Sequence, residues 1–336
     1  MLKISDYSVQ IDALHAEGKT AFEIYEILGL KYPQPIYNYF KKKGWDRLER
    51  KDYNYKTTYQ VDETFFQEIN TEEKAYILGF ICADGHIDCN LYRIIIALQE
   101  SDAELLYKIR ECMHSTHPIK HNIIKTNPYK KSNNSTLKQC SLSINGKQLI
   151  APLIVMGLTN NKTYTLDSSI MNYIPINLWK HFFRGYLDGD GNITWGKKYS
   201  SGNKYLIQVC GNKDFLEGGF QKYFNSACSL YKNAKSKQCY VWKLTDKHKI
   251  LLALVDMYGN AHIYLERKYK IYQYAMWSCK TELIAGNSYF IKLMEGQSAA
   301  NPLVKCLRQV QRLADETIKN PFEEGIEYNS ATNAQH

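Results

Sequence analysis

Two aspartates stand at corresponding places in the chain, and each is followed by a lysine at the same distance. Lys162 follows Asp84 by the same 78 residues by which Lys268 follows Asp190. Two carboxylates held close together are costly unless a cation neutralises them. Mg²⁺ suits a site with few protein oxygens, because water and phosphate oxygens fill its remaining positions. Such a site polarises a phosphodiester and stabilises the leaving alkoxide. If the fold brings Asp84 and Asp190 together, the pair of carboxylates therefore predicts metal-assisted phosphodiester hydrolysis.

Two helices must bring these carboxylates together, and their sequences favour close packing. The stretches 77–85 (ILGFICADG) and 183–191 (FRGYLDGDG) are apolar and end on the acidic residue and a glycine. Small residues four apart on one helix face allow two backbones to approach closely. These residues are Gly79 with Ala83, and Gly185 with Gly189. Gly85 and Gly191 suit the left-handed turn that ends many helices.

The two stretches begin the copies of an internal repeat, which indicates the fold. After the first helix each copy has two strand-like runs, a helical stretch, two further strand-like runs and a closing apolar helix. In the first copy these are 85–99, 102–113, 117–126 with 135–144, and 147–157; in the second they are 192–211, 214–228, 229–238 with 239–245, and 247–259. The pattern predicts an α+β protein with two pseudo-symmetric αββαββα halves.

The first 48 residues predict a separate all-α unit with helices near 9–15 and 20–28 and a third helix to Lys43. Thr20 and Glu23 have capping-box spacing. The predicted small core is Ile11, Leu14, Phe22, Ile24, Ile27, Leu28, Ile36 and Phe40. The sequence is similar to helix-turn-helix units of resolvases and small regulators, whose last helix enters the major groove. That likeness implies DNA contacts by Gln34, Tyr37, Asn38 and Lys41. The alternative is a helical cap without a nucleic-acid role.

The predicted domain organisation has five parts. They are a helix-turn-helix domain at 1–48, a linker at 49–68, a first half at 69–175, a second half at 176–280 and a tail at 281–336. Within the tail, 302–319 has the pattern of an amphipathic helix, and the polar end has the composition of a disordered segment.

The distribution of charge indicates a polyanionic partner. The formal net charge is +9, and no Asp or Glu occurs from Cys112 to Leu166 or between Gly218 and Thr245. Lysines in these windows and in the second hairpin are the candidate DNA contacts. They are Lys120, Lys125, Lys130, Lys131, Lys138, Lys197, Lys198, Lys204, Lys232, Lys235, Lys237 and Lys243.

Composition also excludes some classes of protein. No apolar run has the length of a membrane helix, and the N-terminus lacks the pattern of a signal peptide, so an intracellular protein is expected, with a phage or another mobile element as a plausible origin. The nine cysteines form an odd set without a CxxC pair. This argues against a disulfide framework and a zinc site, and predicts mostly buried thiols.

The two nine-residue stretches resemble the signature of the LAGLIDADG homing endonucleases, and the resemblance covers about 71–274. It implies a monomer whose antiparallel sheets form a saddle over the major groove of double-stranded DNA. It also implies site-specific cleavage of one phosphodiester per strand, with Asp84 and Asp190 catalytic and, with the carbonyls of Ala83 and Gly189, metal-binding. Mg²⁺ is the expected ion, Mn²⁺ a substitute, and Ca²⁺ an ion that binds without supporting cleavage.

Further segments extend the resemblance, and some positions depart from it. The segments 157–167 and 264–270 imply that Lys162 and Lys268 contact scissile phosphates or the water around them. Cys82 stands where the first acidic residue of the motif is usual, whereas the second half keeps Asp188. The alternative function is an RNA-splicing maturase or a non-cleaving DNA-binding regulator on the same scaffold. Because both motif aspartates are present, cleavage is favoured, and the resemblance implies that the enzyme is intron-encoded.

Overall fold

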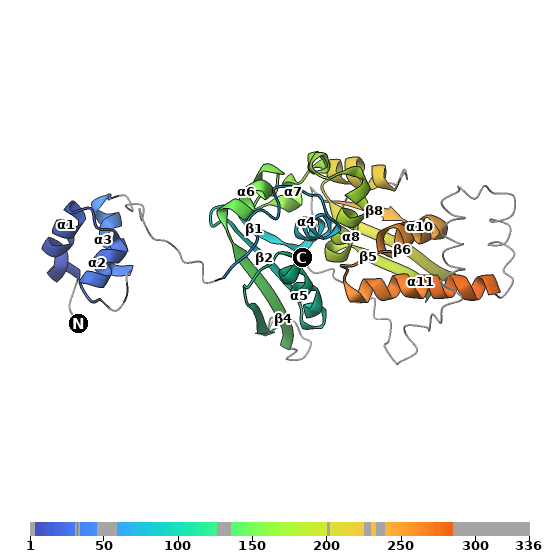
Figure 1. The fold of residues 1–336 in the computed structure, drawn as a ribbon, viewed down its shortest axis with the longest axis horizontal. Helices are drawn as coiled ribbons and strands as arrows, with labels where there is room; N and C mark the ends of the chain where they lie inside the picture. The colour runs from blue at the N-terminus through green and yellow to red at the C-terminus, as the bar shows by residue number, and fades with distance from the viewer. Residues whose placement is uncertain are drawn as a thin grey trace. The chain divides into compact units, whose positions relative to one another are not determined.

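The computed structural model describes residues 4–30, 32, 34–45, 59–125, 136–199, 202–224, 230–232 and 239–284. The chain divides into two compact units, Met1–Thr58 and Tyr59–His336 (Figure 1). The predicted linker at 49–68 is described from residue 59 onward, and this part belongs to the larger unit, where Phe65 and Phe66 are buried in the core. The predicted helix at 302–319 lies outside the described residues.

The N-terminal unit is a bundle of three α-helices, as the sequence predicted. A short 3₁₀ turn precedes the helices α1 (Ser8–Ala16), α2 (Ala21–Ile27) and α3 (Gln34–Lys43). The capping box is confirmed: Thr20 Oγ1 accepts from the Glu23 amide, and Glu23 accepts from the Thr20 amide at 2.7 Å. Ile27, predicted in the core, is 56% exposed instead. The inward face of this short helix is already taken by Ala21 and Ile24, which are buried.

The larger unit contains the predicted repeat. Its first half has α4 (Glu72–Asp84), β1 (His86–Asp88), β2 (Arg93–Gln99), α5 (Ala103–Cys112), β3 (Ile119–Lys125), β4 (Thr136–Asn145), α6 (Lys147–Val155) and α7 (Lys162–Thr165). Two 3₁₀ segments, η3 (Ser168–Tyr173) and η4 (Ile176–Leu178), lead into the second half.

The second half repeats this order with local differences. It has α8 (Trp179–Asp190), β5 (Asn192–Tyr199), β6 (Gly202–Gly211), α9 (Lys213–Phe215), β7 (Tyr231–Lys232), β8 (Tyr240–Leu244), α10 (Lys247–Tyr258) and α11 (Glu266–Ile284). A π-helical segment, η5 (Leu216–Gln221), extends α9. The described residues therefore confirm the α+β class and the repeated αββαββα order.

Each half forms one antiparallel four-stranded sheet with the same strand order. The first sheet is ordered β1-β2-β4-β3 and the second β5-β6-β8-β7. In Figure 1, α4 and α8 lie at the centre of the larger unit, between the two sheets. This arrangement is the expected pair of sheets on either side of a central helix pair.

Buried and more exposed side chains alternate along the strands, so each sheet has a face covered by helices and an open face. In β2, Ile94, Ile96 and Leu98 are buried, and Gln99 is exposed. In β6 and β8, Ile207, Val209 and Trp242 are buried in the same way. Residues that pair across two strands lie on the same face, so the register assigns every described strand residue to one face.

Two further features of the larger unit bear on the site. The long helix α11 was not predicted, and it lies beside β5, where Trp195 Nε1 donates to Ser278 Oγ at 2.8 Å. Four of the seven described cysteines are buried, which agrees with the prediction of mostly buried thiols. None of the described helices combines the length and hydrophobicity that crossing a membrane requires.

Candidate active site

The helices α4 and α8 touch through their glycines, which confirms the predicted close approach. A Cβ added at Gly79 would lie 2.0 Å from the Phe182 carbonyl oxygen, and one at Gly185 would lie 2.0 Å from the Tyr76 carbonyl oxygen. Both positions therefore require the absence of a side chain. The contact is reciprocal, because each helix places its glycine against the backbone of the other.

The predicted left-handed turns at the ends of these helices are wrong. Gly85 has φ −74° and ψ 143°, and Gly191 has φ −80° and ψ 155°, which is backbone open to other residues. The reason for glycine is space. A Cβ on Gly191 would lie 2.5 Å from the Leu187 carbonyl oxygen, and one on Gly85 would lie 2.8 Å from Ile81 Cα.

The two motif aspartates end the two packed helices. Asp84 is half-buried and Asp190 is exposed. A Cβ added at Gly189 would lie 3.3 Å from Asp84 Cβ, so Asp84 lies against the backbone of the residue that precedes Asp190. The structure thus brings the two predicted catalytic carboxylates to the same end of the helix pair.

The donor set fits a weakly coordinated divalent ion. Among the described residues no group of three His, Cys, Asp or Glu side chains is placed to hold a metal. Two carboxylates with backbone oxygens match an ion that takes its other ligands from water and phosphate. The Ala83 carbonyl, a predicted ligand, accepts a hydrogen bond from Lys162 Nζ at 2.6 Å. A carbonyl oxygen has a second lone pair, so this bond leaves it able to bind an ion.

Lys162 lies below the end of α4 rather than on the surface. Its side chain is buried, and Nζ donates to the carbonyl oxygens of Cys82 at 2.9 Å and Ala83 at 2.6 Å. Burial lowers the pKa of Lys162, against the opposing charges of Asp190 and Asp84. The ammonium therefore caps the negative end of the first motif helix and is close enough to both aspartates to feel their charge.

Lys268 occupies the corresponding position in the second half and is held more tightly. Its Nζ donates to the carbonyl oxygens of Leu187, Asp188 at 2.8 Å and Gly191 at 2.7 Å. Burial lowers its pKa to about 7, with the Arg267 charge acting in the same direction. Three acceptors match the three N–H donors of an ammonium group. The two predicted basic residues thus hold the helix ends that carry Asp84 and Asp190.

The acidic residue kept only in the second motif is structural. Asp188 is 1% exposed. It accepts from Tyr76 Oη at 2.8 Å, Tyr258 Oη at 2.6 Å and the Leu265 amide at 2.7 Å. Burial raises the pKa of Asp188, while Lys268 and these donors oppose the shift. The bond from Leu265 fixes the chain just before Lys268.

In the first half the equivalent position is apolar. Cys82 lies 106 residues before Asp188, and Phe182 lies 106 residues after Tyr76, which is the interval between the two motifs. Cys82 is buried, and burial raises its thiol pKa to about 12. The thiol of Cys82 on α4 and the phenyl ring of Phe182 on α8 are thus the counterparts of the carboxylate of Asp188 on α8 and the phenol of Tyr76 on α4.

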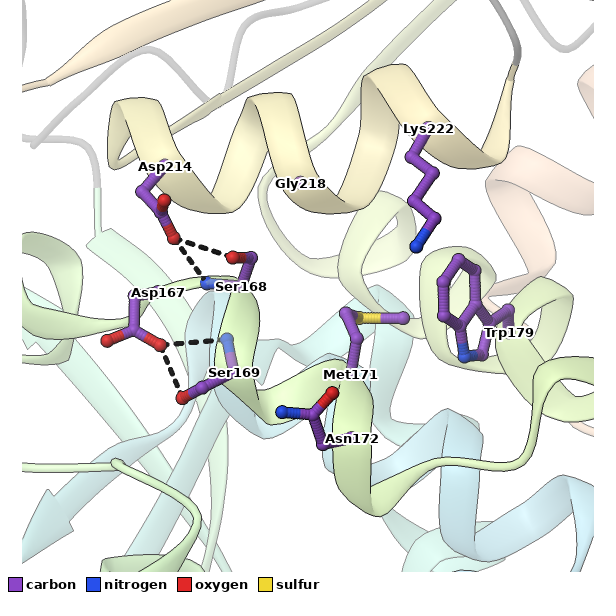
Figure 2. Close-up of a pocket in the computed structure, with 9 residues that line it drawn as sticks. All are labelled: Asp167, Ser168, Ser169, Met171, Asn172, Trp179, Asp214, Gly218 and Lys222. Atoms are coloured by element: carbon purple, nitrogen blue, oxygen red, sulfur yellow. Dashed lines mark hydrogen bonds between the residues drawn. The ribbon is translucent and has the colours of Figure 1, made fainter.

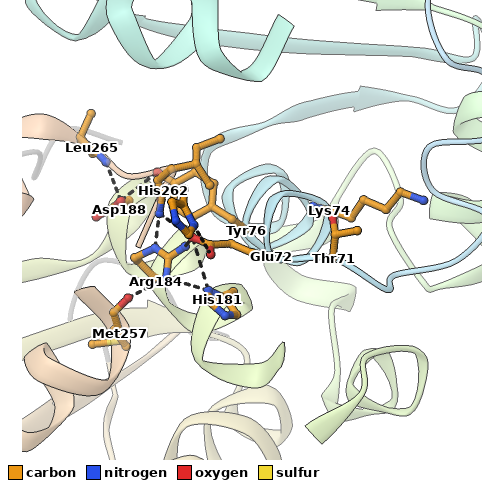
Figure 3. Close-up of polar contacts among 11 residues, drawn as sticks. Thr71, Glu72, Lys74, Tyr76, His181, Arg184, Asp188, Met257, His262 and Leu265 are labelled. Atoms are coloured by element: carbon orange, nitrogen blue, oxygen red, sulfur yellow. Dashed lines mark hydrogen bonds and ion pairs between the residues drawn. The ribbon is translucent and has the colours of Figure 1, made fainter. Parts of the chain in front are cut away.

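At the other end of the helix pair a buried arginine joins the two halves (Figure 3). Arg184 donates to the Met257 carbonyl at 2.6 Å, the Ile263 carbonyl at 3.0 Å and Glu72 Oε1 at 2.7 Å. Glu72 also accepts from the His262 amide at 2.8 Å. These bonds tie the start of α4 to the loop that leads to Lys268. The sequence analysis missed Arg184, although one charge inside an apolar motif was a signal.

A small cavity lies beside Asp190. It has a volume of about 40 Å³ and is lined in part by Lys162, Asp190, Tyr186 and Asn212. That volume accommodates water, which needs about 10–15 Å³ per molecule on this measure. Its lining combines a carboxylate of the second motif with the lysine that follows the first. Asn212, which the sequence analysis did not assign, donates to the Tyr164 carbonyl at 2.8 Å.

A larger, open cavity of about 520 Å³ lies elsewhere, between η3 and the α9–η5 segment (Figure 2). Asp214 accepts from both the amide and the hydroxyl of Ser168, and Asp167 accepts similarly from Ser169. The residues that line it include none of the four predicted catalytic residues. Its size therefore does not identify it as the site of chemistry.

The structure divides the predicted DNA-binding lysines of the sheets between the two faces. The pairing register puts Lys120, Lys204 and Lys243 on open faces, and Lys138 and Lys232 on the covered faces near strand ends. Only the backbone is described for Lys125, Lys197 and Lys198, and four positions lie outside the described residues: Lys130, Lys131, Lys235 and Lys237.

In the N-terminal unit the predicted contacts share one surface of α3. Gln34, Asn38 and Lys41 are exposed and Tyr37 is half-buried, while Ile36 and Phe40 face the core. Gln34 Nε2 donates to Asn38 Oδ1 at 3.1 Å. This surface presents amide and ammonium groups, the types that read base edges.

The chain is similar to known protein structures, whereas the comparisons with sequence families and curated sequences found no match. No known protein-family model and no curated protein sequence matches the chain. Meganuclease I-SmaMI bound to uncleavable DNA matches at 16% identity and a TM-score of 0.42, over 73% of this chain and 99% of its own. LAGLIDADG homing endonuclease I-GzeII with its DNA target matches at 15% identity and a TM-score of 0.41, over 73% and 98%. The homing endonuclease I-WcaI, bound to its recognition sequence, matches at 13% identity and a TM-score of 0.45, over 67% and 95%.

Proposed function

We propose that this chain is a LAGLIDADG-type homing endonuclease that acts as a monomer on a long double-stranded DNA target. It hydrolyses one phosphodiester in each strand. The observation that carries the proposal is the meeting of Asp84 and Asp190 at the ends of two helices whose glycines touch. Two equivalent carboxylates about a pseudo-twofold axis suit a substrate whose two strands run in opposite directions.

Residues of the chain supply positioning and charge at this site. Asp84, Asp190 and the carbonyls of Ala83 and Gly189 are the ligands for a divalent cation, with Mg²⁺ proposed. When bound, that cation neutralises phosphate charge and acidifies a bound water. Lys162 and Lys268 hold the helix ends through their carbonyl oxygens and oppose the charge of the two carboxylates. The small cavity beside Lys162 and Asp190 gives room for water next to the scissile phosphate.

The N-terminal unit adds DNA contacts outside the saddle. Its exposed α3 surface carries Gln34, Asn38 and Lys41. Exchange of Asn38 and Lys41 for alanine should weaken binding to target DNA without changing the cleavage positions. Equal affinity of the variant and the wild type at several salt concentrations would show that this unit is a cap without a nucleic-acid role.

Recovery of cleaved sequences from a DNA library in Mg²⁺ tests the proposed cleavage. The wild type should yield one family of sequences with double-strand breaks. Asp84→Asn and Asp190→Asn should each bind that family but fail to cut both strands. Glu217→Gln, which alters an exposed carboxylate that pairs with Lys213 outside the motif helices, is the matched control. Cleavage by the double aspartate variant at the wild-type rate would refute the site, and binding without any cleavage by the wild type would indicate a regulator.

A further inference from the structure

The register of each sheet defines one row of residues beside each motif aspartate. In the first sheet His86 pairs with Ile95, and Ile95 pairs with Ser143. In the second sheet Asn192 pairs with Gln208, and Gln208 pairs with Lys243. His86 and Asn192 each follow a motif aspartate by two residues. We call His86–Ile95–Ser143 the first inner row and Asn192–Gln208–Lys243 the second inner row.

Both inner rows lie on the open face of their sheets. The neighbours of Ile95 along β2, Ile94 and Ile96, are buried against the helices, so Ile95 points the other way. The neighbours of Gln208 along β6, Ile207 and Val209, are buried in the same manner. His86 and Asn192 are exposed, and the other members of the two rows are half-buried. The rows thus occupy equivalent places on the two surfaces.

The chemistry of the two rows differs. The second inner row presents two carboxamides and an ammonium, and Lys243 Nζ lies 5.1 Å from the centre of the Tyr231 ring on the same face. The first inner row presents an imidazole, a branched apolar side chain and a hydroxyl. In the major groove Asn and Gln pair with adenine, Lys pairs with guanine, and apolar side chains contact the thymine methyl group.

The contrast is confined to the inner rows. In the adjacent rows of the same faces the equivalent residues are Ala97–Ser141–Lys120 and Cys210–Val241–Tyr231, and Cys210 also lines the small cavity beside Asp190. There the ammonium belongs to the first sheet, and the second sheet is apolar or aromatic. A general difference in charge between the two sheets therefore does not explain the contrast between the inner rows.

We propose that the second inner row specifies adenine and guanine by hydrogen bonds beside the cleavage centre, whereas the first inner row tolerates base changes there. This inference rests on the proposed function, since it concerns the DNA bound at that site. Gln208 is the centre of the second row and is assigned to an adenine. Ile95, at the equivalent position, makes only an apolar contact.

A selection on randomised DNA with two readouts tests the inference. The library is selected once for binding in Ca²⁺ and once for cleavage in Mg²⁺, with both pools sequenced. The wild type should discriminate about 5- to 150-fold at the base pair read by Gln208, the range for one bidentate contact. Gln208→Ala should flatten the preference at that base pair and leave the other half of the target unchanged. Ile95→Ala is the matched control and should change preference less than Gln208→Ala.

A second variant makes the test independent of folding defects. Gln208→Glu keeps the length of the side chain but only accepts hydrogen bonds, so it should shift the preference from adenine to cytosine. A uniform loss of affinity for all sequences with Gln208→Ala, or a larger flattening with Ile95→Ala, would overturn the inference. If DNA is selected by binding but never cut, the proposed cleavage fails while the bound pool still decides the base readout. If no sequence is selected in either pool, both proposals fail.

Discussion

The two halves of the larger unit share a backbone plan but differ in what they bury. Both have the same strand order and a motif helix that accepts the other through a glycine. The second half buries Asp188 with Tyr76 and Tyr258, whereas the first half buries Cys82. Backbone approach is fixed by sterics and is the same on both sides. A buried carboxylate with phenol donors is a separate feature, and only the second motif has it.

The largest loss of stability should come from disrupting the glycine contact that both motif helices share. Gly185→Ala and Gly79→Ala each place a methyl group 2.0 Å from a carbonyl oxygen of the opposite helix. Because the helices must separate, we expect each change to cost more than about 4 kcal/mol of unfolding free energy. Denaturant unfolding measures this cost. The control is Gly146→Ala, whose Cβ would make only an ordinary contact of 3.5 Å with Leu149 Cβ. Similar losses in the control and in either variant would show that the helix contact is not special.

The next largest effect tests the difference between the halves. Asp188→Cys gives the second half the residue of the first and leaves Tyr76, Tyr258 and the Leu265 amide without their acceptor. We expect a loss of about 3 kcal/mol, as when one partner of a buried polar network is removed. Cys82→Ala should cost about 1 kcal/mol, the common range for a point change. Chemical denaturation compares the two, and equal costs would mean that the polar network of the second half adds nothing.

The pH dependence of stability should report the burial of the two lysines. Burial lowers the pKa of Lys268 to about 7. Between about pH 7 and 10.5 the unfolded chain holds this proton and the folded chain does not, so the contribution of Lys268 to stability rises with pH. The free energy of unfolding of the wild type should therefore rise relative to that of Lys268→Met by up to about 1.4 kcal/mol per pH unit in this window. Unfolding at pH 6, 8 and 9.5 measures the gain. Lys162→Met should show the same sign, and a constant difference across pH would contradict the burial of Lys268.

The smallest effect concerns lysines on opposite faces of one sheet. Lys120 lies on the open face of the first sheet and Lys138 on its covered face. Neither change to alanine should alter stability by more than about 0.5 kcal/mol, since both side chains are exposed. Lys120→Ala should reduce the slope of log affinity against log salt by about 0.9, the value for one phosphate contact. Lys138→Ala should leave that slope unchanged, and the reverse result would place DNA on the other face.

Much of the fold was accessible from sequence because it is encoded locally. The apolar motif stretches, the apolar run of β2, the alternation in β4 and the repeated order all lie within short windows, and Thr20 with Glu23 marked the start of α2. The role of glycine in close helix packing was predicted correctly where α4 and α8 cross. At Gly85 and Gly191 the predicted reason for glycine was wrong. Lack of space for a side chain and a left-handed backbone both require glycine, so the sequence does not distinguish them.

The sequence by itself determined that Asp84 and Asp190 end two related helices and that a lysine follows each at the same interval. Only the tertiary structure decided what the lysines touch, which is the carbonyl oxygens at the helix ends. It also decided that Asp188 accepts a hydrogen bond from Tyr76, 112 residues away, and that Arg184 joins the halves. Such partners carry no periodic signal, because their distance along the chain is set by how the two halves dock.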